Sequence, residues 1–321
     1  MSMETEASDL AIAARLPRVV IASSAILLAL GAASCLTWWH TGDVRWIRGF
    51  FAGPGAIFFI ACSILQAWLS LRCWRGFSRG DLLRPAWLLI FAAALAGFAG
   101  ALLNQIFGSP SALNPLALLP PASSAPLVHK AAEIGPLCGP LQMLLLACGL
   151  SYVLKACRRN GILGRLMTLD LALVGLVVVY TGWFFATIVF ASEHGGRSVN
   201  AEAVISWASD PLLCVLLFQA ILIRRSTANM GFGLISRCWL SFTAAIFLTS
   251  LGDISLWAWS RGYLPYPLVV ASWFVWFLPS AAYALGPAYQ LIAMLSATRA
   301  DAEAFPAEAA AAGRRNSSST R

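Results

Sequence analysis

Residues 86–107 read AWLLIFAAALAGFAGALLNQIF and contain no charged side chain. An α-helix rises about 1.5 Å per residue, so roughly 20 such residues reach across the roughly 30 Å of hydrocarbon in a bilayer. This stretch therefore predicts a helix that crosses a membrane.

Further apolar runs of similar character lie on both sides of it, separated by short charged loops. We expect about eight helices, at residues 19–39, 50–71, 86–107, 137–154, 166–191, 208–223, 238–260 and 267–295. Pro279 and the Gly286-Pro287 step predict a kink or tilt in the last one. The predicted fold class is all-α, a polytopic transmembrane helix bundle over residues 19–298.

The composition agrees with a lipid environment. Hydrophobic residues make up 59% of the 321 residues and charged residues 11%, whereas soluble domains carry about 25% charged residues. The lipid bilayer is therefore the first expected partner. The net charge of +8 does not indicate nucleic-acid binding, because the basic residues form small clusters between apolar runs instead of one continuous face.

These clusters predict the orientation of the bundle. Lysine and arginine concentrate in cytoplasmic loops, and most basic residues here fall in alternate loops, in the pattern that eight crossings require. Both chain ends are then cytoplasmic. Residues 1–18 form a cytoplasmic amino-terminal segment, and residues 299–321 form a cytoplasmic tail that we expect to be mostly disordered. The clusters contain Arg15, Arg18, Arg72, Arg75, Arg79, Arg84, Lys155, Arg158, Arg159, Arg165, Arg224, Arg225, Arg237, Arg299, Arg314, Arg315 and Arg321.

The first apolar run has a second interpretation. Arg15 and Arg18, an apolar stretch and then Ala32-Ala33-Ser34-Cys35 are typical of a lipoprotein signal peptide. Ala32 stands where such sites usually have Leu, and the apolar run continues through Trp39. A retained first helix is favoured, with lipidation of Cys35 as the alternative.

Several polar or proline positions predict helix boundaries. Residues 108–136 contain six prolines and predict a loop. Asp210 before Pro211 has the pattern of a helix start, with Asp as the N-cap. Asp170, near the start of the fifth helix, is expected to be interfacial.

A charged side chain inside the hydrocarbon is costly and so points to a function. Asp253 is the best candidate, because at helical spacing it shares a face with Thr249, Ser250 and Trp257. We expect this face to point into the bundle, where Asn104 and Gln142 from other helices converge with it as candidate ligand-binding residues. The alternative is a buried aspartate that hydrogen-bonds neighbouring helices.

Established catalytic and metal-binding signatures are missing from the sequence. The three histidines, His40, His129 and His194, fall in expected outer loops, too far from the membrane interior to hold a buried haem. We also find no phosphate-binding loop, nucleophile elbow or H-E-x-x-H motif. We therefore expect no catalytic residue, metal or cofactor, and no enzymatic activity.

The stretch 209–289 resembles the membrane-embedded sensory region of bacterial diguanylate cyclases and histidine kinases. The resemblance is carried by short motifs, which are Asp210-Pro211-Leu212-Leu213, Leu251-Gly252-Asp253, Gly262-Tyr263, Ser272-Trp273 and Ala281-Ala282-Tyr283-Ala284-Leu285-Gly286-Pro287. Cys214 stands where the family commonly has an acidic residue, the acidic residue of the outer turn is missing, and no cyclase or kinase part is present. The resemblance implies a sensory-type bundle without its output domain, in a bacterial cytoplasmic (inner) membrane.

Three functions follow as hypotheses. The first is a receptor-type bundle that binds a small or lipophilic ligand and signals through a cytoplasmic protein or a homo-oligomer. The second is a transporter or permease that uses Asp253 for ion or proton coupling, although two related halves, typical of transporters, are not evident beyond a loose echo of Trp-rich outer turns. The third is an accessory subunit of a membrane complex.

Overall fold

The computed structural model describes residues 3–107, 126–163, 201–228, 233–260, 262–265, 267–268 and 277–318, and several positions between 168 and 182. Its named elements are all helical. They are α1 (Met3–Thr41), α2 (Arg45–Phe50), the π-helix η1 (Phe51–Gly55), α3 (Ala56–Gly76), α4 (Leu83–Phe107), α5 (Pro126–Arg159), α7 (Ala201–Ala228), α8 (Leu234–Ser260) and α10 (Phe277–Ser318).

Six of the described helices are long and apolar enough to cross a membrane. They are Leu10–Thr41, Arg45–Gly76, Leu83–Gly100, Leu137–Arg159, Pro211–Ala228 and Leu234–Gly252. Large apolar side chains on these helices face outward, such as Val19 (58% exposed) and Leu36 (67%). Such a surface suits an apolar solvent. The all-α class with membrane-length apolar helices is confirmed, and the number of eight crossings stays a prediction.

Three predicted boundaries differ from the structure. α5 begins at Pro126, so residues 126–136 are helical and not loop, since proline is well tolerated in the first turn of a helix. α7 begins at Ala201, so Asp210 is not an N-cap and Pro211 lies inside the helix. α10 continues to Ser318 through residues for which we expected disorder, and alanine, the best helix former, is abundant there.

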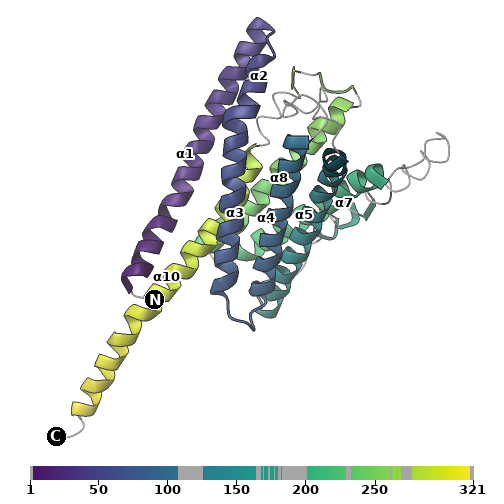
Figure 1. Ribbon diagram of the computed structural model, residues 1–321. Coiled ribbons are helices and arrows are strands. Elements are labelled where there is room, and N and C mark those ends of the chain that lie inside the picture. The colour runs from purple at the N-terminus through teal and green to yellow at the C-terminus, as the bar shows by residue number, and fades with distance from the viewer. Residues whose placement is uncertain are drawn as a thin grey trace.

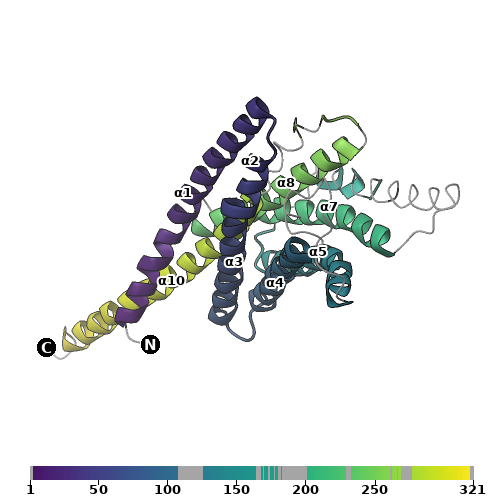
Figure 2. The same cartoon turned by 45° about the horizontal axis from the view of Figure 1, so that its top comes forward.

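Six helices form a closed ring. In order around it, α3, α4, α5, α7, α8 and α10 each pack on the next, and α10 packs back on α3. α1 lies outside this ring, along α10 and beside α2 (Figures 1 and 2). The amino-terminal end of α1 and the carboxyl-terminal end of α10 lie toward the same end of the molecule as the α3–α4 turn (Figure 1).

We call this end the basic end. Exposed basic side chains occur in the last turn of α3, in the α3–α4 turn, in the last turn of α5 and at the start of α8, and they include Arg75, Arg79, Arg158, Arg159 and Arg237. Two further arginines lie over tryptophan rings, Arg72 over Trp68 at 5.6 Å and Arg84 over Trp74 at 5.3 Å. Such cation–π contacts occur where a charge meets an aromatic surface.

α10 is the most enclosed helix of the ring. It packs on α8, α3 and α1, and most of its side chains from Phe277 to Ile292 are buried. It carries Ser280, Tyr283 and Gln290 and is not among the six apolar spans. Because protein surrounds it on several sides, this helix tolerates polar side chains that a lipid-facing helix does not.

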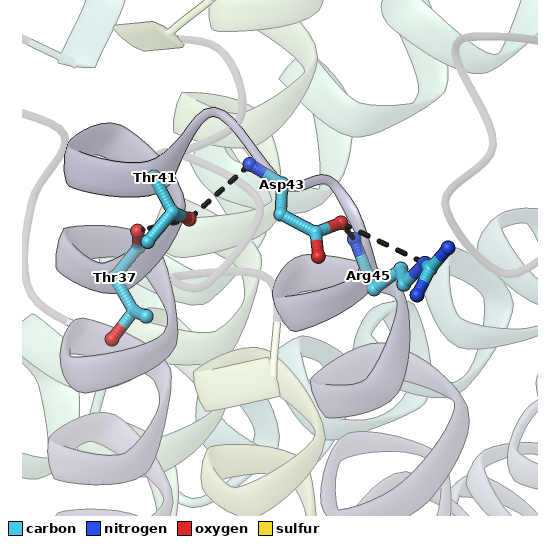
Figure 3. Close-up of polar contacts among 4 residues, drawn as sticks. All are labelled: Thr37, Thr41, Asp43 and Arg45. Carbon is cyan, nitrogen blue, oxygen red and sulfur yellow. Dashed lines mark hydrogen bonds and ion pairs between the residues drawn. The ribbon is translucent and has the colours of Figure 1, made fainter.

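At the opposite end, a short turn joins α1 to α2 (Figure 3). Gly42 has a φ of +70°, and its N–H donates to the carbonyl of Trp38 at 2.7 Å. The side chain of Asp43 then accepts a hydrogen bond from the N–H of Arg45 at 2.9 Å. A left-handed glycine ends α1 and a carboxylate satisfies the first turn of α2.

The α8–α10 contact yields a stability prediction. A Cβ atom at Gly286 would lie 2.5 Å from Cε2 of Phe242, and Phe242 is fully buried between Trp239 and Tyr283. The phenyl ring of Phe242 has little room to move, so we expect Gly286→Ala to lower the free energy of unfolding by about 1–3 kcal/mol through overpacking. The melting temperature in detergent measures this cost. The control is Gly139→Ala, where nothing lies within 4 Å, and equal melting of both variants would contradict the packing.

Candidate functional site

The structure describes the side chains of three of the six predicted site residues. Thr249 and Ser250 lie half-buried on α8, and their hydroxyls donate to the carbonyls of Ala245 and Ile246 at 2.9 Å each. Gln142 lies on α5 against α4, since a Cβ at Gly97 would come within 2.5 Å of its Cδ. α5 and α8 are not neighbours in the ring, so Gln142 belongs to a different helix contact. The side chains of Asp253, Trp257 and Asn104 lie outside the described residues.

The ring contains a repeated arrangement that we did not recognise in the sequence. α3, α4 and α5 follow one another in the ring, and so do α7, α8 and α10. α3 and α5 run toward the basic end, and α4 runs away from it. In the same way, α7 and α10 run toward the basic end, and α8 runs away from it. We call these the first triplet and the second triplet. The order of the helices around the ring and their directions are those that a half-turn about the ring axis would produce.

α3 and α7 share a glutamine, an alanine, a leucine and an arginine at the same spacing near the basic end. α3 reads Gln66-Ala67-Trp68-Leu69-Ser70-Leu71-Arg72, and α7 reads Gln219-Ala220-Ile221-Leu222-Ile223-Arg224-Arg225. The glutamine, alanine and leucine are buried in both helices and the final arginine is half-buried in both. The four residues that the two segments share therefore have the same degree of burial in both helices.

α4 and α8 match over a longer distance. The identical pairs are Trp87 and Trp239, Leu88 and Leu240, Ala92 and Ala244, Ala93 and Ala245, and Gly100 and Gly252. Each tryptophan is buried and the leucine after it is exposed, in both helices. The two indole rings lie 6.2 Å apart where the triplets meet. This contact lies at the position expected for a two-fold axis.

α5 and α10 complete the correspondence. α5 reads Ala147-Cys148-Gly149-Leu150-Ser151-Tyr152-Val153-Leu154, and α10 reads Ala284-Leu285-Gly286-Pro287-Ala288-Tyr289-Gln290-Leu291. A Cβ at Gly149 would meet the side chain of Ile90, and a Cβ at Gly286 would meet Phe242. Ile90 and Phe242 are themselves equivalent positions, three residues after the paired tryptophans. The same close helix approach is therefore built twice.

Polar side chains connect the two triplets. Between α7 and α5, Nε2 of Gln219 donates to Oγ of Ser151 at 2.9 Å. Between α3 and α10, Sγ of Cys73 donates to the carbonyl of Pro287 at 3.5 Å. Four buried polar atoms have no hydrogen-bond partner among the described residues, Oγ of Ser70, Nε1 of Trp87, Oε1 of Gln219 and Nη1 of Arg224. An unsatisfied buried polar atom costs about 1–3 kcal/mol, so such atoms mark positions that need an explanation.

A buried ion pair lies at the basic end. Oδ1 of Asp170 lies 2.6 Å from Nη1 of Arg225, with the Asp170 side chain 2% exposed and the Arg225 side chain 38% exposed. Asp170 is buried against α7, and its expected position at the depth of the membrane interface stays a prediction. Nη1 of the adjacent Arg224 is buried without a hydrogen-bond partner in the described part of the chain.

Metal-binding side chains do not gather in the described residues, where no group of three or more His, Cys, Asp or Glu could hold an ion. Comparison with protein-family models, with curated proteins and with solved structures finds no match for this chain. The features available for a functional conclusion are therefore the triplet interface, the polar face of α8 and the path of α10.

Proposed function

We propose that this protein is a sensory, receptor-type bundle of a bacterial inner membrane. It binds a small or lipophilic ligand among its helices and passes the signal to a separate cytoplasmic protein or within a homo-oligomer. The observation that carries this proposal is α10, which is both the most enclosed helix of the ring and the one that leaves it.

α10 has the properties of a transmission element. Its first half is buried against α8, α3 and α1, so a ligand that changes the packing of those helices displaces it. The same helix continues without interruption to Ser318 and projects from the bundle at the basic end (Figure 1). A continuous helix carries a displacement along its axis. The resemblance of residues 209–289 to sensory membrane regions supports the same function.

The test separates ligand binding from transmission. A compound that raises the melting temperature of the protein in nanodiscs is first identified from a small-molecule screen. We expect it to change hydrogen–deuterium exchange of residues 299–318 in the wild type. Thr298→Pro, which interrupts the helix at an exposed position, should leave the melting shift intact and abolish the exchange change.

Thr298→Ala serves as the control and should behave as the wild type, because it keeps the helix continuous. Stabilisation by ligand with no exchange change beyond residue 298 in the wild type would contradict a sensory role for α10. A compound that changes the exchange of residues 299–318 equally in Thr298→Pro and in the wild type would contradict it as well.

The two triplets support a second candidate, a transporter. Transporters are often built from repeats, and parallel repeats related by an axis along the membrane normal occur among them, with substrate sites at the repeat interface. Flux of a stabilising compound across proteoliposomes would favour this function over reception. If neither flux nor a melting shift is found, the role of an accessory subunit gains support.

A further inference from the structure

We propose that Arg224, at the basic end, binds the phosphate group of an anionic ligand, either an anionic phospholipid or a small soluble phosphate compound. This inference is independent of the sensory function proposed above. It is carried by a guanidinium group that the described part of the chain leaves without a partner.

Arg224 and Arg225 are adjacent on α7 but point in directions about 100° apart around the helix. Arg225 pairs with Asp170, with 2.6 Å between Nη1 and Oδ1. Arg224 follows Ala220 by one turn, and the carbonyl of Ala220 accepts a hydrogen bond from Oγ1 of Thr243 at 3.2 Å. Since Thr243 belongs to α8, Arg224 lies on the side of α7 that faces α8. The carboxylate that neutralises Arg225 does not serve Arg224.

The guanidinium of Arg224 is partly shielded from water and has no counter-ion. Its Nη1 is buried without a hydrogen-bond partner, and the ion pairs of the described residues do not include Arg224. The residue as a whole is only half-buried, so it lies at the surface of the bundle, where a ligand can approach it. A charged group that is shielded from water is costly unless it is paired, so this position calls for a bound anion.

The first triplet is an internal control for this position. In the correspondence that pairs Gln66 with Gln219, Arg225 is equivalent to Arg72 and Arg224 to Leu71. Leu71 and Arg224 are both half-buried, so an apolar side chain satisfies the packing at this place. The arginine of the second triplet is therefore not required by the helix arrangement, and a ligand explains its presence.

The helices on either side of α7 add positive charge and no anion. The last turns of α5 carry only basic ionisable side chains, which are Lys155, Arg158 and Arg159. The acidic residues of α7 and α8 that are nearest in sequence are Asp210 and Asp253, and both lie toward the opposite end of these helices. A mobile anion is thus attracted to this end of the bundle.

A phosphate group is the anion that fits this position best. The planar guanidinium donates two parallel hydrogen bonds to a phosphate, and arginine binds this group more specifically than a lysine does. The basic end is predicted to face the cytoplasm, and basic positions between helices on that side bind the head groups of anionic lipids. A soluble phosphate compound offers the same oxygen atoms to the same guanidinium.

The experiment compares melting temperatures of the full-length protein with and without phosphate ligands. One arm uses nanodiscs of phosphatidylcholine alone or mixed with an equal part of phosphatidylglycerol. The other uses neutral detergent with sodium phosphate or sodium chloride at one ionic strength. We expect the anionic nanodisc, the phosphate buffer or both to raise the wild-type melting temperature by about 5 °C. A shift with the lipid alone assigns the site to a head group, and a shift of the same size with inorganic phosphate assigns it to a soluble compound.

Arg224→Leu, which introduces the residue of the first triplet, should lose this shift. Arg75→Leu removes the same charge from an exposed position at the same end and should keep it. No response of the wild type in either arm would overturn the proposal. So would a response that survives in Arg224→Leu, and an equal loss in Arg75→Leu would show general attraction by surface charge instead.

The variants without ligand provide a second test. In neutral detergent with chloride, Arg224→Leu should melt no lower than the wild type, because it removes a charge that the protein does not compensate. Arg224→Gln, which keeps a polar side chain of similar shape, is measured beside it and replaces it if Arg224→Leu does not fold. A clear loss of stability in both variants would show that the protein itself holds the guanidinium, which contradicts an anion site.

Discussion

Replacing Arg225 with Met should destabilise the protein by about 3–5 kcal/mol, more than replacing Asp170 with Asn. The two partners of this ion pair are buried to different degrees, 2% exposed for the Asp170 side chain and 38% for that of Arg225. Removing the arginine leaves a carboxylate out of contact with solvent, which is the costly case. Removing the charge of Asp170 leaves an arginine that still reaches solvent.

The free energy of unfolding in mixed micelles, from denaturant titrations, measures the difference. Arg72→Met is the matched control, because Arg72 is the equivalent residue of the first triplet and lies over the ring of the exposed Trp68. We expect a smaller loss there. In the Arg225→Met background, Asp170→Asn should restore part of the stability, because it removes a buried charge that has lost its arginine partner. A larger loss for Asp170→Asn than for Arg225→Met would refute this account of the pair.

Replacing Trp87 with Ala should cost about 3–5 kcal/mol, the range for removing a fully buried aromatic side chain. Trp87 has no exposed surface, and its ring lies 6.2 Å from that of Trp239 and 6.1 Å from that of Phe242. The cavity would open where the two triplets meet. Because the triplets are equivalent, Trp239→Ala should cost a similar amount. Trp68→Ala, at a side chain 45% exposed, should cost much less.

Trp87→Phe isolates the indole nitrogen. Nε1 of Trp87 has no hydrogen-bond partner in the described residues, so losing it while keeping an aromatic ring should cost clearly less than Trp87→Ala. Thermal unfolding followed by the remaining tryptophan fluorescence compares the variants. If Trp87→Phe is as damaging as Trp87→Ala, the indole N–H makes a bond that matters to stability.

Part of the candidate site could be predicted from the sequence. Thr249 and Ser250 share a half-buried face of α8 because helical spacing alone decides which residues lie together on one helix. The convergence of Gln142 with that face could not be deduced in this way. It depends on which helices are neighbours, and Gln142 of α5 packs on Gly97 of α4 instead.

The repeat formed by the two triplets could not be recognised from the sequence, for a physical reason. Its identities are few and separated, such as the glutamine, alanine, leucine and arginine shared by α3 and α7. The spacing between equivalent residues differs from one helix pair to the next, because the connecting segments differ in length. In a helix that faces lipid or small side chains, one apolar residue can often replace another. The equivalent positions of two helices become evident only from contacts that both helices make, such as those at the close-packed Gly149 and Gly286.

The sequence by itself determined the apolar character of the helices and the local structure of this protein. Long runs without charge predicted apolar helices of membrane length, since hydropathy and helix length are properties of each segment alone. The tertiary structure decided that α10 is enclosed by its neighbours, that Asp170 is buried against Arg225, and that two triplets meet at Trp87 and Trp239. Burial and pairing are set by segments far apart in the chain, and no single segment contains that information.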